Sequence, residues 1–261
     1  QQERAAGRDI RMVYSTFDAL DIARSNPDRR VVFLGVGFET TAPTVAAALE
    51  QAAARGQRNF CVYSAHKLVP PALNALLSAG TVNVDGFLLP GHVSVIIGER
   101  VYRFLAEKFG VPGVIAGFEP TDLLQGIALL VETVQAGAVR LDNAYPRAVG
   151  ENGNPKALRL MEQAFTVTDA EWRGLGTIPK SGLAIREHLA DYDAARLFGL
   201  QVAAVPEPAG CACGQVLTGT VTPPQCPLFR TACTPMSPVG PCMVSSEGTC
   251  AAWYRYHEEE D

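Results

Sequence analysis

Short apolar runs that alternate with helix-like segments are the strongest constraint on the fold of this chain. The runs are rich in Val, Ile, Leu and Phe and occupy residues 10–14, 31–38, 60–64, 84–89 and 113–117. Continuous runs of this kind are typical of strands buried in a parallel sheet. Their starts lie 21 to 29 residues apart, which leaves room for one helix between successive strands. The pattern predicts an α/β fold of βαβ units, with open parallel sheets flanked by helices.

The segments between these runs have helical character, and several end at a glycine that suits a helix C-cap. We expect helices within residues 17–25, 42–56, 70–80, 94–110 and 121–137. Residues 172–185 are rich in Gly and Pro, so we expect an irregular connector there. The predicted organisation is an α/β domain over residues 1–140, a helical and irregular region that completes it over 141–205, and a cysteine-rich lobe over 206–261.

Charge and hydropathy argue against two classes of partner. The net charge is −5 with a pI near 5.5, and no run of Lys or Arg occurs, so the chain offers no electrostatic surface for nucleic acid or an anionic membrane. No apolar run approaches the roughly 18 residues that span a bilayer. The first residues, QQERAAGRDIR, lack the apolar core of a signal peptide. We therefore expect a cytoplasmic protein.

Six of the seven cysteines fall within forty residues near the C-terminal end, whereas Cys61 stands alone. The six are Cys211, Cys213, Cys226, Cys233, Cys242 and Cys250. In a reducing compartment such crowding indicates metal or redox chemistry. No C-x2-4-C knuckle and no histidine occurs among them, which favours an all-cysteine iron-sulfur cluster over zinc. Two thiols would remain for an exchangeable dithiol, and a zinc or disulfide staple is the alternative; spacing alone does not say which four are ligands.

Polar residues follow several apolar runs, at the sheet edge where α/β proteins place ligands. His92 in PGHVS is a candidate ligand or proton carrier, or a simple hydrogen-bonding residue. Glu39 and Glu119 occur in two related Gly-Phe-Glu junctions, where capping of the next helix is the competing role. His66 is expected in a solvated loop. Neither a nucleotide-binding glycine motif nor a nucleophile elbow is present.

Several longer motifs, in the same order, resemble the HypD family of hydrogenase maturation proteins. They are GFETTAP (37–43), PGHVS (90–94), GFEPTDLL (117–124), AYPRAV (144–149), GLGTIPKSGL (174–183) and the cysteine segments CACGQVLTG, PPQCPLF, CTP and PVGPCMVSSEGTCAA. The resemblance runs from about residue 9 to residue 257. It implies two related sheet domains and a small cluster-bearing domain whose cysteine layout is similar to ferredoxin:thioredoxin reductase.

The resemblance also implies roles for the cysteines. The family's [4Fe-4S] ligand pattern falls on Cys211, Cys226, Cys233 and Cys250. Cys213 and Cys242 are then a redox pair beside the cluster. The implied function is a scaffold that assembles the Fe(CN)2CO unit of [NiFe]-hydrogenases with HypC, using cyanide delivered from HypE. The iron precursor would be held at the sheet edge near His92.

Two departures from the family pattern bear on this expectation. The family carries CGTH and GPGCPVC motifs upstream of the matching region, and neither occurs here, which predicts a fragment of a longer protein or a form without that chemistry. NGN (152–154) stands where EGN is expected. Two other functions stay open: a thiol-disulfide oxidoreductase that acts on a protein through Cys213 and Cys242, and a partner-docking module whose metal is only structural.

Overall fold

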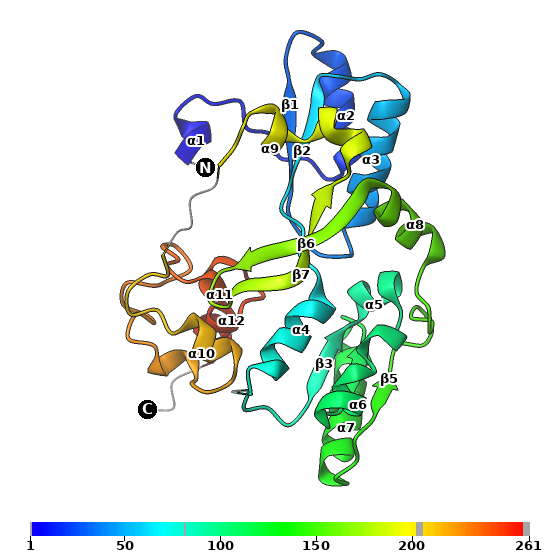
Figure 1. Ribbon diagram of the computed structural model, residues 1–261. Coiled ribbons are helices and arrows are strands. Elements are labelled where there is room, and N and C mark those ends of the chain that lie inside the picture. Colours follow the sequence, from blue (N-terminus) through cyan, green and yellow to red (C-terminus); the bar gives the residue numbers. More distant parts are fainter. Residues whose placement is uncertain (1, 81, 202–205, 258–261) are drawn as a thin grey trace. The chain divides into compact units, whose positions relative to one another are not determined.

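The computed structural model describes residues 2–80, 82–201 and 206–257 and divides into two compact units (Figure 1). The first unit comprises Gln1–Lys67, Pro155–Val167 and Leu183–Gln201. The second comprises Leu68–Asn154, Thr168–Gly182 and Val202–Asp261. Each unit contains a parallel sheet with helices packed on it, which confirms the predicted α/β class. The domain boundaries that we placed at residues 140 and 205 stay predictions.

The first unit is built on strands β1 (Val31–Gly35) and β2 (Phe60–Ser64), which pair in parallel. Helix α3 (Ala42–Ala54) connects them, and α2 (Thr16–Ser25) packs on α3 and β1. α2 begins at a capping box in which Ser15 and Asp18 satisfy each other's backbone N–H groups. The remaining helices of the unit are α1 (Gln2–Ala5), α8 (Pro155–Ala164), η2 (Glu187–Tyr192) and α9 (Ala194–Leu197). Its fully buried core includes Val45, Leu49, Phe60 and Val62.

The strand predicted at residues 10–14 does not form, and that prediction is wrong. Met12 and Tyr14 are 81% and 94% exposed. Isolated strands are unstable, because their N–H and C=O groups need a paired neighbour. In the described sheets β1 pairs with β2 and has no strand on its other side. Ile10, Arg11 and Val13 instead line a groove of about 820 Å³ beside β1.

The second unit contains three parallel strands in the order β3 (Phe87–Pro90), β4 (Gly113–Ala116) and β5 (Leu141–Asn143). Its helices are α4 (Val69–Ser78), α5 (Gly91–Ile97), η1 (Arg100–Tyr102), α6 (Phe104–Phe109) and α7 (Pro120–Gln135). The single helix predicted within residues 94–110 is therefore broken. The break falls at Gly98, whose φ of +82° and ψ of 173° suit glycine alone.

Residues 165–185 form two strands, and the second strand covers most of residues 172–185, where the sequence predicts an irregular connector. β6 (Phe165–Trp172) pairs with β7 (Gly176–Ile185) in a sheet of two strands. Only three residues separate them, and such a short connection makes a hairpin. Gly174 and Gly176 supply the positive φ angles of its turn, and Trp172 Nε1–H donates to Ser181 Oγ at 2.8 Å across it. The prediction is wrong because turn residues and strand residues alternate in this stretch.

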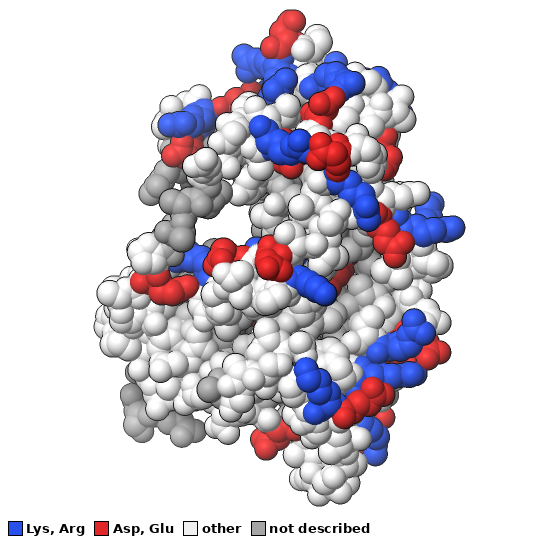
Figure 2. All heavy atoms as spheres, viewed as in Figure 1, with Lys and Arg blue, Asp and Glu red and all other residues white. Residues whose placement is uncertain are grey.

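The cysteine-rich lobe belongs to the second unit and contains only short elements. They are α10 (Cys213–Leu217), η3 (Pro223–Gln225), α11 (Pro241–Val244) and α12 (Thr249–Tyr256). On the face drawn in Figure 2, basic and acidic side chains of the described residues are interspersed rather than gathered by sign. No helix in the part of the chain that the structure describes is long and apolar enough to cross a membrane.

Candidate functional site

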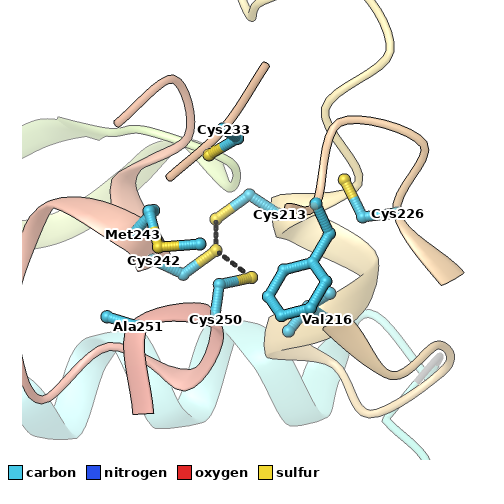
Figure 3. Close-up of a cluster of buried hydrophobic side chains, with 9 residues drawn as sticks. Cys213, Val216, Cys226, Cys233, Cys242, Met243, Cys250 and Ala251 are labelled. Atoms are coloured by element: carbon cyan, nitrogen blue, oxygen red, sulfur yellow. Dashed lines mark hydrogen bonds between the residues drawn. The ribbon is translucent and has the colours of Figure 1, made fainter. Parts of the chain in front are cut away.

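The six cysteines of the lobe gather in one small core, as Figure 3 shows for most of them. Five are at least 93% buried, and Cys211 is half-buried against the same cluster. Val216, Phe229, Met243 and Ala251 fill the space between them. All six thiols are free. The lobe therefore packs around sulfur atoms, with few large apolar side chains of its own.

Cys242 lies at the centre of the sulfur contacts (Figure 3). Its Sγ lies 2.9 Å from Cys213 Sγ and 3.2 Å from Cys250 Sγ. The three residues come from separate short helices, α10, α11 and α12. The thiols of Cys213 and Cys242 are close enough to form a disulfide after a small movement, and the thiol of Cys250 is adjacent to Cys242.

Backbone groups and glycines fix the other cysteines. Val239 N–H donates to Cys233 Sγ at 3.3 Å, and Cys226 Sγ–H points to Gly210 O at 3.9 Å. A Cβ on Gly240 would lie 2.6 Å from Cys211 Sγ, so only glycine leaves room for that sulfur. The sulfur positions thus depend on backbone geometry.

Burial disfavours the charged form of two of these thiols. It raises the pKa of Cys211 and of Cys250. The hydrogen bond with Cys242, followed by burial, raises the pKa of Cys213 well above its usual range. A buried thiolate needs a cation or metal beside it. Iron bound by these sulfurs would supply that charge.

The possible metal donors of the lobe are cysteine sulfurs without histidine, which is the donor chemistry of an iron-sulfur cluster. Within the described residues no three His, Cys, Asp or Glu side chains converge so as to hold one metal ion. The thiolates of an iron-sulfur cluster bind separate irons and need not converge on one point. Six cysteines in one apolar lobe, without histidine, match that requirement. The ligand assignment to Cys211, Cys226, Cys233 and Cys250 stays a prediction.

His92 lies at the carboxyl end of the second unit's sheet, as the sequence predicts. β3 ends at Pro90, and His92 is the second residue of α5. The imidazole is exposed and stacks on Phe118, with the ring centroids 4.4 Å apart and the planes at 28°. A Cβ on Gly91 would lie 2.4 Å from Ala116 O, so the helix start approaches β4 closely. The histidine is therefore an exposed side chain that is stacked on one aromatic ring.

The two predicted glutamates have different environments. Glu119 is the N-cap residue of α7, is exposed, and accepts a hydrogen bond from Arg147 at 3.2 Å. Arg147 also binds both oxygens of Asp122, at 2.7 and 2.6 Å, and this pairing lowers the pKa of Asp122. Glu39 lies in the first unit and is buried. Glu119 therefore directly follows Phe118, the residue on which His92 stacks, whereas Glu39 belongs to the other unit.

Arg147 and Phe118 are residues that the sequence reasoning did not single out. Arg147 lies over the ring of Tyr145, 4.5 Å from its centroid, and both belong to the AYPRAV segment after β5. The AYPRAV motif is visible in the sequence, but the sequence alone does not assign a functional role to its residues. The position directly after a parallel strand was the available signal.

His66 lies in a loop after β2, as predicted, but it is buried, so the predicted solvent exposure is wrong. Only 1% of its surface is exposed, because it packs against Phe165 and against Gly35 at the end of β1. Its Nδ1 lies 3.4 Å from Ser64 Oγ, and Nε2 has no hydrogen-bond partner. Burial lowers the pKa of His66 to about 4.

This depressed pKa predicts acid-sensitive stability of the first unit. The unfolded state, with a pKa near 6.5, binds the proton first, so stability is fully present above about pH 6.5 and is lost as the pH falls toward 4. The loss should amount to roughly 3 kcal/mol. Urea unfolding at several pH values checks it: the wild type should lose more stability than His66→Gln over this range, and His188→Gln, an exposed control, should follow the wild type. Equal slopes for the wild type and His66→Gln would contradict it.

Fold and site together define a class: an α/β protein of parallel sheets that carries a small lobe of buried cysteines. Comparison with known proteins identifies the family. The HypD family model, described as "Hydrogenase formation hypA family", matches residues 1–257. The chain is 49% identical over 260 residues to the hydrogenase maturation factor HypD of Rhodobacter capsulatus, covering 98% of this chain and 69% of that protein.

Two further relatives agree. The HypD factors of Cupriavidus necator and of Escherichia coli strain K12 are each 46% identical, over 265 and 260 residues, and each match covers 99% of this chain and 70% of the relative. The chain belongs to the HypD family of hydrogenase maturation factors, and the resemblance found in the sequence is confirmed.

Proposed function

We propose that this chain is a redox-active scaffold that helps to assemble the Fe(CN)2CO unit of [NiFe]-hydrogenases, together with a HypC-like chaperone and a HypE-like cyanide donor. Family membership supports the maturation role. The observation that carries the redox part is the contact of Cys242 Sγ with both Cys213 Sγ and Cys250 Sγ inside one buried lobe.

The lobe's residues fit two tasks. Cys211, Cys226, Cys233 and Cys250 would hold a [4Fe-4S] cluster, which when bound exchanges single electrons. Cys213 and Cys242 would cycle between dithiol and disulfide, so that oxidation of the pair releases two electrons and two protons. Contact between Cys242 and the proposed ligand Cys250 supports electron transfer between these two sites over a short path.

His92 would contact the iron precursor, which is the cargo of the scaffold. Its exposed imidazole, fixed by stacking on Phe118, is suited to bind or to hydrogen-bond the iron precursor at the carboxyl edge of the sheet. Arg147 and Asp122 brace the loop and helix that flank this edge. Glu119 adds a carboxylate that is available to a partner or to the cargo.

Burial argues against a general thiol-disulfide oxidoreductase. Such an enzyme needs one thiol of its pair open to attack by a protein substrate. Cys213 and Cys242 are 1% and 7% exposed. A pair that is closed to solvent is better suited to exchange electrons inside the lobe.

Pull-down of a HypC-like chaperone by the purified chain, made without oxygen, tests the scaffold role. We expect specific retention of the chaperone by the wild type and weaker retention after His92→Ala. His188→Ala, exposed and in the first unit, is the matched control. Failure of the wild type to retain the chaperone would contradict the proposed partnership.

Replacement of Cys213 by serine distinguishes two hypotheses: that Cys213 and Cys242 are a redox pair, and that the metal of the lobe is only structural. We expect the variant to keep its iron but to lose the disulfide-linked peptide that joins residues 213 and 242 in oxidised protein. Mass spectrometry after non-reducing digestion measures the link, and iron analysis measures the metal. Loss of iron in Cys213→Ser, or absence of the link in oxidised wild type, would contradict the assignment of the pair.

A further inference from the structure

The turn of the β6–β7 hairpin lies against Cys213, within the second unit. A Cβ on Gly174, in this turn, would lie 3.7 Å from Cys213 Sγ. Gly214 follows Cys213 in α10, and a Cβ there would lie 2.5 Å from Gly174 O. Since a Cβ essentially never comes so close to another heavy atom, residue 214 has no room for a side chain. The hairpin turn therefore meets α10 backbone to backbone, beside one cysteine of the proposed redox pair.

A groove of about 680 Å³ runs up to this contact. Its walls include Gly174 and Leu175 of the turn, Gly214 of α10 and Leu76 of α4. Cys213 is not among the residues that line it, and only 1% of Cys213 is exposed. The backbone of the turn and of α10 thus separates the groove from the sulfur. Movement of the turn away from α10 would open a path from the groove to the thiol.

Two hydrogen bonds tie the turn to the segments around the cysteines. Gly174 N–H donates to Glu207 Oε1 at 2.6 Å, and Arg173 Nη2 donates to Val239 O at 3.4 Å. The first bond is short and has a charged acceptor, which makes it the stronger of the two. It reaches the same residue, Gly174, that lies against Cys213. Glu207 is therefore the side chain best placed to hold the turn on α10.

We propose that the hairpin turn is a cover that determines what the Cys213–Cys242 pair reacts with, and that Glu207 is the positioning residue that holds this cover closed. Thiol-disulfide exchange requires access to a sulfur. The closed cover excludes thiols, disulfides and oxidants of the solvent from Cys213, so the pair exchanges electrons within the lobe. The inference rests on the proposed redox pair, and it adds a specificity-determining role for the hairpin and for Glu207.

Alkylation of Cys213 by N-ethylmaleimide tests the cover on the full chain purified without oxygen. Peptide mass spectrometry measures the labelled fraction of Cys213 over time. Cys61, which is buried in β2 of the first unit, reports any general unfolding in the same digest. The labelling rate follows the population in which the cover is open. We expect Glu207→Ala to label Cys213 at least about threefold faster than the wild type, because the hydrogen bond to the turn is lost, with Cys61 unchanged.

Glu207→Gln separates the hydrogen bond from the charge. The hydrogen bond with Cys242, followed by burial, raises the pKa of Cys213, and the charge of Glu207 adds to this. Loss of the charge alone would therefore speed alkylation, which needs the thiolate. Glutamine keeps an acceptor for Gly174 N–H, so Glu207→Gln should label Cys213 within about twofold of the wild-type rate. Glu247→Ala, which removes an exposed carboxylate elsewhere in the lobe, should do the same.

Gly214→Ala reaches the same contact from α10. Its Cβ would lie 2.5 Å from Gly174 O and should push the turn away, although alanine suits a helix better than glycine does. We expect Cys213 to be labelled at least about tenfold faster in this variant, again with Cys61 unchanged.

Two results would overturn the cover. One is a wild-type labelling rate of Cys213 in folded Glu207→Ala, and the other is equal acceleration by Glu207→Gln and Glu207→Ala. If Glu207→Ala unfolds, the labelling of Cys61 rises with that of Cys213, and Gly214→Ala then decides: a wild-type rate in that variant would also overturn the cover. Absence of the disulfide-linked peptide that joins residues 213 and 242 would instead overturn the redox pair, whereas the labelling rates measure the cover in either case.

Discussion

Replacing Cys250 with serine should reduce the bound iron from about four atoms per chain to less than about one. A [4Fe-4S] cluster needs four thiolates in this setting, and a serine hydroxyl does not replace one in a buried apolar lobe. The same result is expected for Cys211, Cys226 and Cys233. Iron analysis and the visible absorption of protein purified without oxygen measure the effect.

Two controls use the same substitution elsewhere in the chain. Cys61 is buried in β2, outside the lobe, and Cys61→Ser should keep its iron. Cys242→Ser should also keep it, although Cys242 Sγ touches Cys250 Sγ. If Cys242→Ser lost its iron and Cys250→Ser kept it, the division into ligands and redox pair would be wrong.

The largest effect on stability is expected from Gly98→Ala. Gly98 ends α5 with a positive φ, and a Cβ there would lie 2.4 Å from Glu151 O and 2.5 Å from Gly153 N. Backbone atoms cannot move aside as a flexible side chain does. The strained φ and the clash together should cost about 3 kcal/mol or more, a fall in Tm of roughly 6–12 °C.

Gly110→Ala is the matched control for this change. Gly110 ends α6 in the same unit with a φ of +68°, and nothing lies within 4 Å of its Cβ position. It should lose only about 1 kcal/mol, the cost of the left-handed conformation. Thermal unfolding compares the two variants. Equal losses would show that the contact between α5 and residues 151–153 does not hold α5, and with it His92, in place.

The sequence predicts the buried parallel strands because their apolar runs are continuous. β1, β2 and β4 form where such runs occur. Residues 10–14 are also largely apolar but have no paired neighbour in the described sheets, and they form no strand and are mostly exposed. Local composition specifies that a segment can form a strand, whereas pairing decides whether it does.

The candidate site is predictable in part for a similar reason. Cysteine count and spacing indicate a metal or thiol centre, because those residues are chemically distinctive. The contact between Cys213 and Cys242 joins residues 29 positions apart, and no local pattern encodes it. The stacking of His92 on Phe118 likewise depends on β3 and β4 being neighbours in the sheet.

The most direct measurement of the central claim is metal analysis combined with electron paramagnetic resonance on the chain purified without oxygen. We predict about four irons and about four acid-labile sulfides per chain. The reduced protein should give the signal of a [4Fe-4S] cluster. One zinc per chain in place of iron, with no such signal after reduction, would contradict the account.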